Sequence, residues 1–309
     1  MVFWSSRSWW SRCQWNPGRF RSSPLSPQSI PSPTGYPAER VTEPSQVSEV
    51  VRFLRAHFGS PPRTPLLDLS ETTLLGPRDY LWMVRDTEGI VGTLRYHFIG
   101  TMVEPIYMVD SFCIHPRWRR KGVGDFLLNE LHRYANQHRM PNALFLKEGQ
   151  PIHPFPLYTG VYVFRKVEAG PYPHLRALSS NEAERRMDHF QSVYPNVLLI
   201  RRPGLPWYLY QQGEHWIMIC IQDTYQRMPD GARIAWITGW IERPGTTDAL
   251  RAAASEEALF SQFGKAAYLW TNRAWVGGSS AWTADGPFHW YTYQWNTSAT
   301  MNPSYLIPS

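Results

Sequence analysis

Cysteine is scarce in this chain, and long apolar runs are missing. The three cysteines, Cys13, Cys113 and Cys220, are odd in number and far apart, so they offer neither a disulfide framework nor the spacing of a metal site. We therefore expect a reducing, intracellular location, the cytoplasm. No stretch approaches the roughly 20 apolar residues of a membrane-spanning helix, and the N-terminus lacks the apolar core of a signal peptide. We expect no membrane span and no bound metal.

Charged residues are also sparse, at 18% of the 309 residues, and the net charge is +6. This positive excess suits an anionic ligand. The basic residues gather at one loop rather than along a face, which disfavours nucleic acid as a partner. Hydrophobic residues make up 43% of the chain and aromatic residues 15%. That composition supports a real core in one large or two ordinary domains.

Residues 1–34 are rich in Ser, Pro, Arg and Trp and show no periodicity. Within them, Ser22–Thr34 has too many prolines for a helix or an inner strand, so we expect an extended arm. The arm also holds more large rings than a disordered tail usually does. We expect some of these rings to dock on the body of the protein: Phe3, Trp4, Trp9, Trp10 and Trp15.

From residue 35 the chain reads as helices and strands. A helix opens at Thr42-Glu43-Pro44-Ser45 and ends near Gly59. The turn signal Asp86-Thr87-Glu88-Gly89 joins two strands into a hairpin. The predicted strands of this half are Tyr80–Arg85, Ile90–Ile99, Pro105–His115, Ala143–Leu146 and Leu157–Phe164, and a second helix covers 122–138.

The second half repeats this order with weaker signals. Its predicted elements are helices over Ser180–Phe190 and Ala249–Phe263 and strands over Trp207–Gln211, His215–Tyr225, Ala232–Ile241, Ala266–Thr271 and Phe288–Trp295. No glycine-rich basic loop follows Ile241, where the chain continues Glu242-Arg243-Pro244-Gly245. We predict an α+β (mixed α/β) fold of two tandem lobes, 35–168 and 169–309, each a mostly antiparallel twisted sheet flanked by helices. The second lobe is expected to be a degenerate copy of the first.

The most informative stretch is Val109–Gly124, which reads V-D-S-F-C-I-H-P-R-W-R-R-K-G-V-G. The strand must end at His115-Pro116, because proline cannot donate to a ladder and restricts the residue before it. An amphipathic helix begins at once, from Val123. Between them lies the basic loop, Arg119–Gly124. Its glycine-permitted amides, the positive helix end and the cationic side chains suit a diphosphate, although a solvated turn is the plain alternative.

The pattern R-x-x-G-x-G of the basic loop, between a strand ending in His-Pro and an amphipathic helix, resembles motif A of the GCN5-related N-acetyltransferase (GNAT) superfamily. That motif holds the pyrophosphate of coenzyme A. The resemblance implies that Arg119, Arg120, Lys121, Gly122, Val123 and Gly124 bind the diphosphate. It also implies that the pantetheine lies along the strand at Phe112, Cys113 and Ile114, and that both lobes are GNAT-like.

Two tandem lobes with coenzyme A in the first resemble the glycylpeptide N-myristoyltransferase family. The segments that carry this likeness are Phe3-Trp4, Val109–His115, Pro156–Arg165 and Asp285–Trp295. The chain also departs from that family. Its basic loop reads R-R-K-G-V-G rather than R-S-K-R-x-A-P, Phe164 replaces a histidine and Asp110 replaces an asparagine. The threonine of the family's Y-T-A-G stretch is not recognisable around Lys147–Gly149.

Transfer of an acyl group from a thioester to an amine needs backbone donors for the oxyanion and a base for the amine. The family resemblance implies that Ser111 and Phe112 supply the amides, and that the C-terminal carboxylate of Ser309 is the base. Asp110 and Glu148 are alternative carboxylates. The resemblance further implies that Phe3 and Trp4 contact the acyl-CoA. From the residues themselves, Cys113 is expected to be a buried core thiol and His115 a hydrogen-bonding group at the strand end.

The predicted function is an acyl-CoA-dependent N-acyltransferase resembling N-myristoyltransferase. Its co-substrate would be myristoyl-CoA or acetyl-CoA, and its acceptor a peptide, protein or small-molecule amine, such as an N-terminal glycine. A GNAT-type acetyltransferase is the near alternative, because the basic loop is of that type. A structural or binding protein that keeps the fold without turnover is the alternative from another class.

Overall fold

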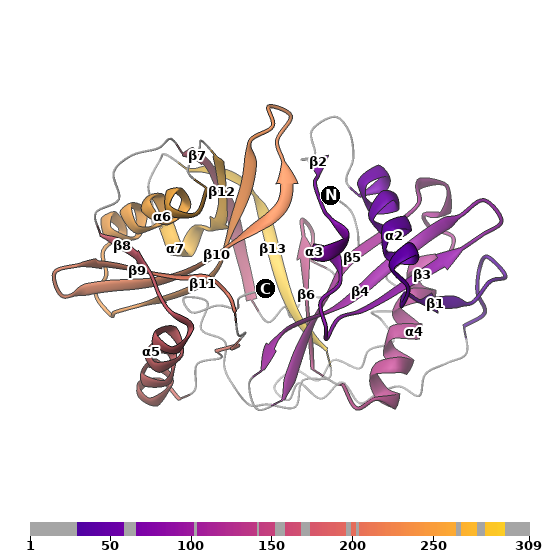
Figure 1. The fold of residues 1–309 in the computed structure, drawn as a ribbon, viewed down its shortest axis with the longest axis horizontal. Helices are drawn as coiled ribbons and strands as arrows, with labels where there is room; N and C mark the ends of the chain where they lie inside the picture. The colour runs from indigo at the N-terminus through magenta and orange to yellow at the C-terminus, as the bar shows by residue number, and fades with distance from the viewer. Residues whose placement is uncertain are drawn as a thin grey trace. The chain divides into compact units, whose positions relative to one another are not determined.

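The computed structural model describes residues 30–58, 66–101, 104–140, 142–151, 158–167, 174–195, 199–201, 204–263, 267–276 and 282–293. They form a mixed α/β fold in which most strand pairs are antiparallel (Figure 1), which confirms the predicted fold class. The chain divides into two compact units. Unit 1 takes Met1–Phe98, Glu104–Leu157 and His289–Ser298, and unit 2 takes Ile99–Val103, Tyr158–Phe288 and Ala299–Ser309. The predicted lobe boundaries at residues 34 and 168 stay predictions.

Unit 1 contains a sheet with the strand order β1-β3-β4-β5-β6. Strands β1 and β3 and strands β3 and β4 pair antiparallel, whereas β5 and β6 pair parallel. The parallel pair is connected by helix α4, as a crossover requires. In chain order the elements are β1 (Ala38–Arg40), α2 (Pro44–His57), β2 (Leu66–Leu67), α3 (Glu71–Leu74), β3 (Tyr80–Arg85), β4 (Ile90–Thr101), β5 (Pro105–Ile114), the 3-10 turn η1 (Pro116–Trp118), α4 (Val123–Gln137) and β6 (Ala143–Glu148).

Helices α2 and α4 cover opposite faces of this sheet (Figure 1). Along β3, Trp82 and Val84 belong to the apolar cluster under α4, and Leu81 and Met83 belong to the cluster under α2. Successive side chains of a strand point to opposite faces, so both sides of β3 are core. This explains why β3 reads as a continuous apolar run rather than an alternating one.

Local signals fix the start of α2 and the β3–β4 turn. Glu43 caps α2, with Gln46 Oε1 accepting the Glu43 amide at 3.1 Å in a capping box and Pro44 at the first helical position. In the hairpin, Asp86 Oδ1 accepts the amides of Glu88 and Gly89 at 2.8 and 3.0 Å. Both elements form where the sequence predicts them.

Unit 2 has the strand order β7-β12-β11-β10-β9-β8. Its elements are β7 (Tyr158–Val167), β8 (Leu175–Ala177), α5 (Ser180–Val193), β9 (Trp207–Gln212), β10 (His215–Arg227), β11 (Arg233–Glu242), α6 (Asp248–Phe263), β12 (Ala267–Asn272), α7 (Arg273–Val276) and β13 (Thr283–Tyr293), the last divided between the units at His289. As β5 and β6 do in unit 1, β11 and β12 pair parallel on either side of a helix, here α6. The order of elements therefore repeats, as predicted.

The predicted elements all form, with several strands longer than expected. β4, β6, β7 and β10 each continue two or three residues beyond their predicted ends, and β13 begins at Thr283 rather than at Phe288. The sequence Asp285-Gly286-Pro287 looks like a turn, but β13 runs through it. The short elements β1, β2, α3, β8 and α7 were not predicted, because pieces of two to four residues carry no readable periodicity.

Candidate functional site

Strand β5 changes phase at Ser111. Before it, Tyr107 and Val109 contact the apolar cluster under α4, and after it Phe112 and Ile114 do. One face of a regular strand takes every second residue, so this shift requires one extra residue. Ser111 has φ 47°, in the left-handed region that a non-glycine residue rarely adopts. Both observations identify a β-bulge at Ser111.

The two strands beside β5 differ in how they bond to the bulge. The parallel ladder to β6 has only two register pairs, Tyr107 with Ala143 and Met108 with Leu144, so it ends before the bulge. On the other side, Thr93 Oγ1 of β4 donates to the Ser111 carbonyl at 2.9 Å. The bulge is thus held from β4 and released from the β6 ladder.

The basic loop ends at the first turn of α4. Gly122 caps the helix with φ 85°, a conformation that favours glycine. The first helical hydrogen bond runs from the Phe126 amide to the Gly122 carbonyl at 3.0 Å. Within the described part of the chain, the amides of Gly122, Val123 and Gly124 make no hydrogen bond. Such unused amides and the helix dipole create a favourable position for an anion.

Gly124 has a different role from Gly122. A Cβ atom at position 124 would lie 3.0 Å from Cζ of Phe112, so the glycine lets the Phe112 ring approach the first turn of α4. Phe112 directly follows the bulge. The ring therefore connects the bulge in β5 with the start of the helix.

The cationic side chains of the basic loop are exposed. The Nε of Arg119 donates to the Ile114 carbonyl at 3.2 Å, and Lys121 Nζ lies 5.1 Å from the centre of the Trp118 ring. Among the described residues, none of Arg119, Arg120 and Lys121 forms an ion pair. Their charge is therefore not neutralised by a carboxylate of this part of the chain.

Cys113 and His115 behave as the sequence predicts. Cys113 is fully buried in the cluster under α2, and burial raises the pKa of its thiol to about 12 against the opposing charge of Arg119. Such a thiol is not an available nucleophile. His115 Nδ1 accepts the Arg117 amide at 3.2 Å and caps η1. The His57 ring lies 4.5 Å from the His115 ring; burial lowers the pKa of His57, and the charges of His115 and Arg119 lower it further.

Asp110 is held by a two-point ion pair. The Nε and Nη2 of Arg95 each lie 2.6 Å from one of its carboxylate oxygens, and Arg95 Nη1 donates to the Leu74 carbonyl at 2.6 Å. The Asp110 carboxylate would have to give up these two hydrogen bonds from Arg95 to accept a proton. The other carboxylate, Glu148, ends β6, where its backbone carbonyl accepts a hydrogen bond from the buried Lys147. Burial lowers the pKa of Lys147, and Glu148 opposes this.

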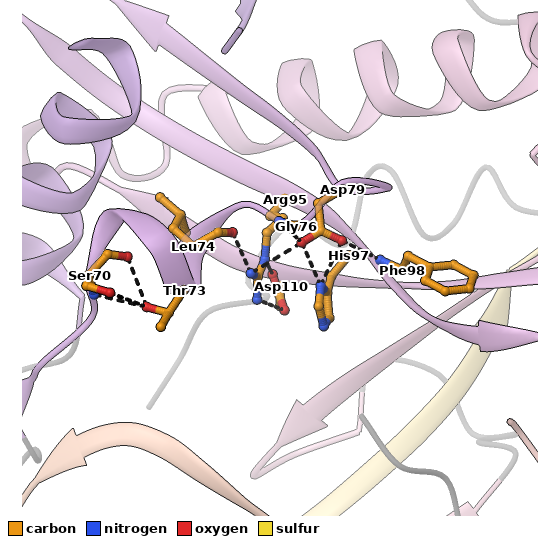
Figure 2. Close-up of polar contacts among 9 residues, drawn as sticks. All are labelled: Ser70, Thr73, Leu74, Gly76, Asp79, Arg95, His97, Phe98 and Asp110. Carbon is orange, nitrogen blue, oxygen red and sulfur yellow. Dashed lines mark hydrogen bonds and ion pairs between the residues drawn. The ribbon is translucent and has the colours of Figure 1, made fainter. Parts of the chain in front are cut away.

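A buried polar network that the sequence analysis missed lies next to Asp110 (Figure 2). Asp79, with 4% of its side chain exposed, accepts His97 Nδ1 at 3.0 Å and the amides of Gly76 and Phe98 at 2.8 Å each. Arg95 Nη1 lies 3.8 Å from its Oδ2. Burial alone would raise the pKa of Asp79, but the bond and charge of His97 and then Arg95 and Gly76 outweigh it and hold that pKa at about 2.

Figure 2 shows the network as one connected set on β4, β5 and the segments beside them. Asp79 and Arg95 are 16 residues apart, and Arg95 and Asp110 are 15 apart. No local spacing could have united them. The pairing of β3 with β4 brings Asp79 to Arg95, and the pairing of β4 with β5 brings Arg95 to Asp110.

Three predicted site residues, Phe3, Trp4 and Ser309, lie outside the described residues. The others gather in unit 1, along β5 from Asp110 to Ile114 and in the basic loop. Within the described residues, no group of three His, Cys, Asp or Glu side chains could hold a metal. No helix among them has the length and apolar character needed to cross a membrane.

Residues 48–155 match the family model described as Acetyltransferase (GNAT) family. The match runs from within α2 to beyond β6 and includes the bulge and the basic loop. This part of the chain therefore carries the likeness to the GNAT family. The GNAT resemblance predicted from the basic loop is thereby confirmed.

Solved structures extend the likeness beyond residues 48–155. Saccharomyces cerevisiae N-myristoyltransferase, solved with bound myristoyl-CoA and inhibitors, has a TM-score of 0.62 and 14% sequence identity, covering 92% of this chain and 88% of that one. A second structure of that enzyme with bound myristoyl-CoA has a TM-score of 0.60 and 13% identity, covering 92% and 86%. At such identity the likeness shows an N-myristoyltransferase-like fold. No curated protein matches the sequence.

Proposed function

We propose that this chain is an acyl-CoA-dependent N-acyltransferase. The diphosphate of coenzyme A binds the amides of Gly122, Val123 and Gly124 together with the cations of the basic loop. The pantetheine lies along β5 beyond Met108, where the ladder to β6 has ended. The thioester carbonyl then reaches the backbone amides at Ser111 and Phe112, which stabilise the oxyanion of the tetrahedral intermediate.

The observation that carries this proposal is the bulge at Ser111, three residues before the end of the strand that leads into the basic loop. A bulge re-aims backbone groups and ends strand pairing. The strand that carries the bulge leads through the basic loop to the N-terminus of α4, whose first amides make no hydrogen bond within the described residues. A thioester of coenzyme A needs both, one for its carbonyl oxygen and one for its diphosphate.

We propose a long acyl chain as the donor, because the similar solved structures were determined with myristoyl-CoA. Acetyl-CoA is the second candidate, since the basic loop reads R-R-K-G-V-G in the acetyltransferase manner. Mass spectrometry of acyl-CoAs retained on the purified protein distinguishes them. A bound long-chain species supports the first, and a bound acetyl species supports the second.

Turnover is tested with a peptide that carries an N-terminal glycine and an internal lysine, given with myristoyl-CoA or acetyl-CoA. We expect release of free coenzyme A and a peptide heavier by one acyl group, with the position found by fragmentation. Tight binding of acyl-CoA without transfer to either amine would instead support a binding protein that keeps the fold.

A further inference from the structure

We propose that His57, His115 and Arg119 together bind a phosphate monoester, the one that the ribose of coenzyme A carries beside its diphosphate. This inference rests on the proposed function and extends it, because that function assigns a place only to the diphosphate. The three side chains come from the last turn of α2, from the residue that follows β5 and from the first position of the basic loop.

The three side chains lie close together. The ring centres of His57 and His115 are 4.5 Å apart, and the rings meet edge to face. Arg119 Nε donates to the Ile114 carbonyl at 3.2 Å, which holds the guanidinium beside the peptide that leads into His115. The positive charge of Arg119 acts on the pKa of His57 and on that of Cys113, which packs under α2. The guanidinium therefore lies on the α2 side of the strand end, where the two rings are.

Each of the three side chains has hydrogen-bond donors to spare. His115 Nδ1 accepts the Arg117 amide at 3.2 Å, so the hydrogen of a neutral His115 ring is on Nε2. Within the part of the chain that the structure describes, no hydrogen bond is formed by this Nε2, by either ring nitrogen of His57 or by the terminal nitrogens of Arg119. A phosphate monoester offers three acceptor oxygens and can use all three groups at once.

The groups that surround His57 are positively charged or apolar. Burial, His115 and Arg119 all lower its pKa, and the centre of the Phe53 ring lies 4.9 Å from that of His57. Among the described residues, neither His57 nor Arg119 forms an ion pair with a carboxylate. The free protein therefore holds groups of like charge together, and a bound anion relieves their repulsion.

The acidic groups on the side of His115 belong to the β3–β4 turn. Asp86 and His115 act on each other electrostatically, but the Asp86 carboxylate already accepts Trp118 Nε1 at 2.8 Å and two amides of its own turn. The Glu88 carboxylate lies 3.2 Å from Arg117 Nη1. Both carboxylates thus have partners of their own, which leaves the three donor side chains to a ligand.

One nucleotide can reach this site and the amides at the start of α4 together. Arg119 precedes Gly122 by three residues, a length of chain that spans at most about 11 Å. In coenzyme A a single ribose carries both the diphosphate and the monoester. With the diphosphate at the amides of Gly122, Val123 and Gly124, the monoester can lie at Arg119 and the two histidines.

A bound dianion should also change the protonation of His57. In the free protein burial, His115 and Arg119 lower its pKa, so the ring is mostly neutral at neutral pH. A phosphate dianion beside the ring favours the charged form and raises that pKa. Binding should therefore take up a proton, and the affinity should increase as the pH falls toward the range in which histidine titrates.

The test titrates coenzyme A and dephospho-coenzyme A, which lacks only the monoester, into the full chain by calorimetry. Titrations at about pH 7 in two buffers with different heats of ionisation measure proton uptake together with affinity. His57→Phe keeps a ring against Phe53 but removes both nitrogens, and His57→Gln keeps a donor that cannot be charged. His138→Phe is the matched control, because His138 also lies at the end of a helix with its ring near another, 4.1 Å from Tyr134, but at the far end of α4.

We expect the native protein to bind coenzyme A about tenfold more tightly than dephospho-coenzyme A, the effect of a hydrogen bond to a charged group, and to take up protons only with coenzyme A. His57→Phe should lose most of this preference and the proton uptake, with an unchanged affinity for dephospho-coenzyme A. His57→Gln should keep part of the preference without the uptake. His138→Phe should behave like the native protein.

The inference and the proposed function fail in different ways. If the native protein binds the two ligands with equal affinity, or if His57→Phe keeps the full preference and uptake, the monoester does not bind here, while the proposed function stands. If His57→Phe weakens both ligands alike, His57 supports the local fold rather than the phosphate, and the inference is wrong. If the native protein binds neither ligand, the proposed function fails and the inference fails with it.

Discussion

Gly124 and Phe112 approach so closely that a Cβ atom on the glycine would lie 3.0 Å from the ring edge. The contact joins the first turn of α4 to the residue after the bulge. The basic loop and the bulge, the two ends of the candidate site, are therefore coupled through one ring. A change at either residue should move the other.

Gly124→Ala sets two opposing effects on stability against each other: the higher helix propensity of alanine and the cost of displacing the Phe112 ring. Alanine should stabilise an open helix position by about 1 kcal/mol, but here the ring must shift, and overpacking costs about 1–3 kcal/mol. We expect a net loss in the free energy of unfolding and weaker binding of coenzyme A. Phe112→Leu combined with Gly124→Ala should recover part of both.

The control for that pair is Gly286→Ala, since nothing lies within 4 Å of a Cβ at position 286. It should leave both the free energy of unfolding and coenzyme A binding close to those of the native protein. Equal behaviour of the two alanine variants would show that the Phe112 contact is unimportant.

Arg95 and Asp110 form a partly buried pair, with 12% and 21% of their side chains exposed. Removing one partner leaves a charge without its counter-ion, so Arg95→Met should cost about 3 kcal/mol of unfolding free energy, measured by urea denaturation. Asp110→Leu in the same chain should restore most of that loss. If the double variant is as unstable as the sum of the single ones, the pair is not coupled as described.

Because the pKa of Asp79 is low, the free energy of unfolding should decrease at acidic pH. Its pKa is depressed in the folded state, so its contribution is present above the pKa of the unfolded chain and is lost as pH falls toward 2. A depression of this size corresponds to roughly 2 kcal/mol at neutral pH. Urea denaturation between pH 6 and about 2 should show a flatter profile for Asp79→Asn than for the native protein.

Cys113 should resist alkylation in the folded protein, because its buried thiol has a pKa of about 12. Iodoacetamide at about pH 8, followed by peptide mass spectrometry, should modify this residue only after denaturation. Cys113→Ser should retain acyl transfer if the residue has no covalent role. Rapid modification of the native protein, blocked by acyl-CoA, would point instead to an exposed thiol in the site.

Much of this site can be predicted from the sequence. The apolar residues Tyr107 and Val109 are odd-numbered, whereas Phe112 and Ile114 are even-numbered. That change of phase in the apolar pattern is the sequence signal of the bulge. The basic loop can also be predicted, because its glycines follow a strand that ends at a proline and precede an amphipathic helix.

The Asp79 network could not be read in the same way. Asp79, Arg95 and His97 look like ordinary charged residues at the surface of a strand or turn, and none belongs to a motif. Asp79 meets His97 and Arg95 through the β3–β4 hairpin and the turn from Gly76 to Asp79, and Arg95 meets Asp110 through the pairing of β4 with β5. The bulge at Ser111 shifts the β5 register by one residue, so the partner of Arg95 cannot be found by counting along β5.

The most direct test is calorimetric titration of coenzyme A into the native protein, Gly122→Val and Gly213→Val. Gly122 and Gly213 both have positive φ, 85° and 60°, with nothing within 4 Å of an added Cβ, but Gly213 lies in the β9–β10 turn of unit 2. Both variants thus place a β-branched residue at a positive φ. We predict that the native protein and Gly213→Val bind coenzyme A with one-to-one stoichiometry and that Gly122→Val loses at least tenfold in affinity, since one RT ln 10 step is about 1.4 kcal/mol. Equal affinities in all three proteins, or no binding by the native protein, would contradict a diphosphate site at the basic loop.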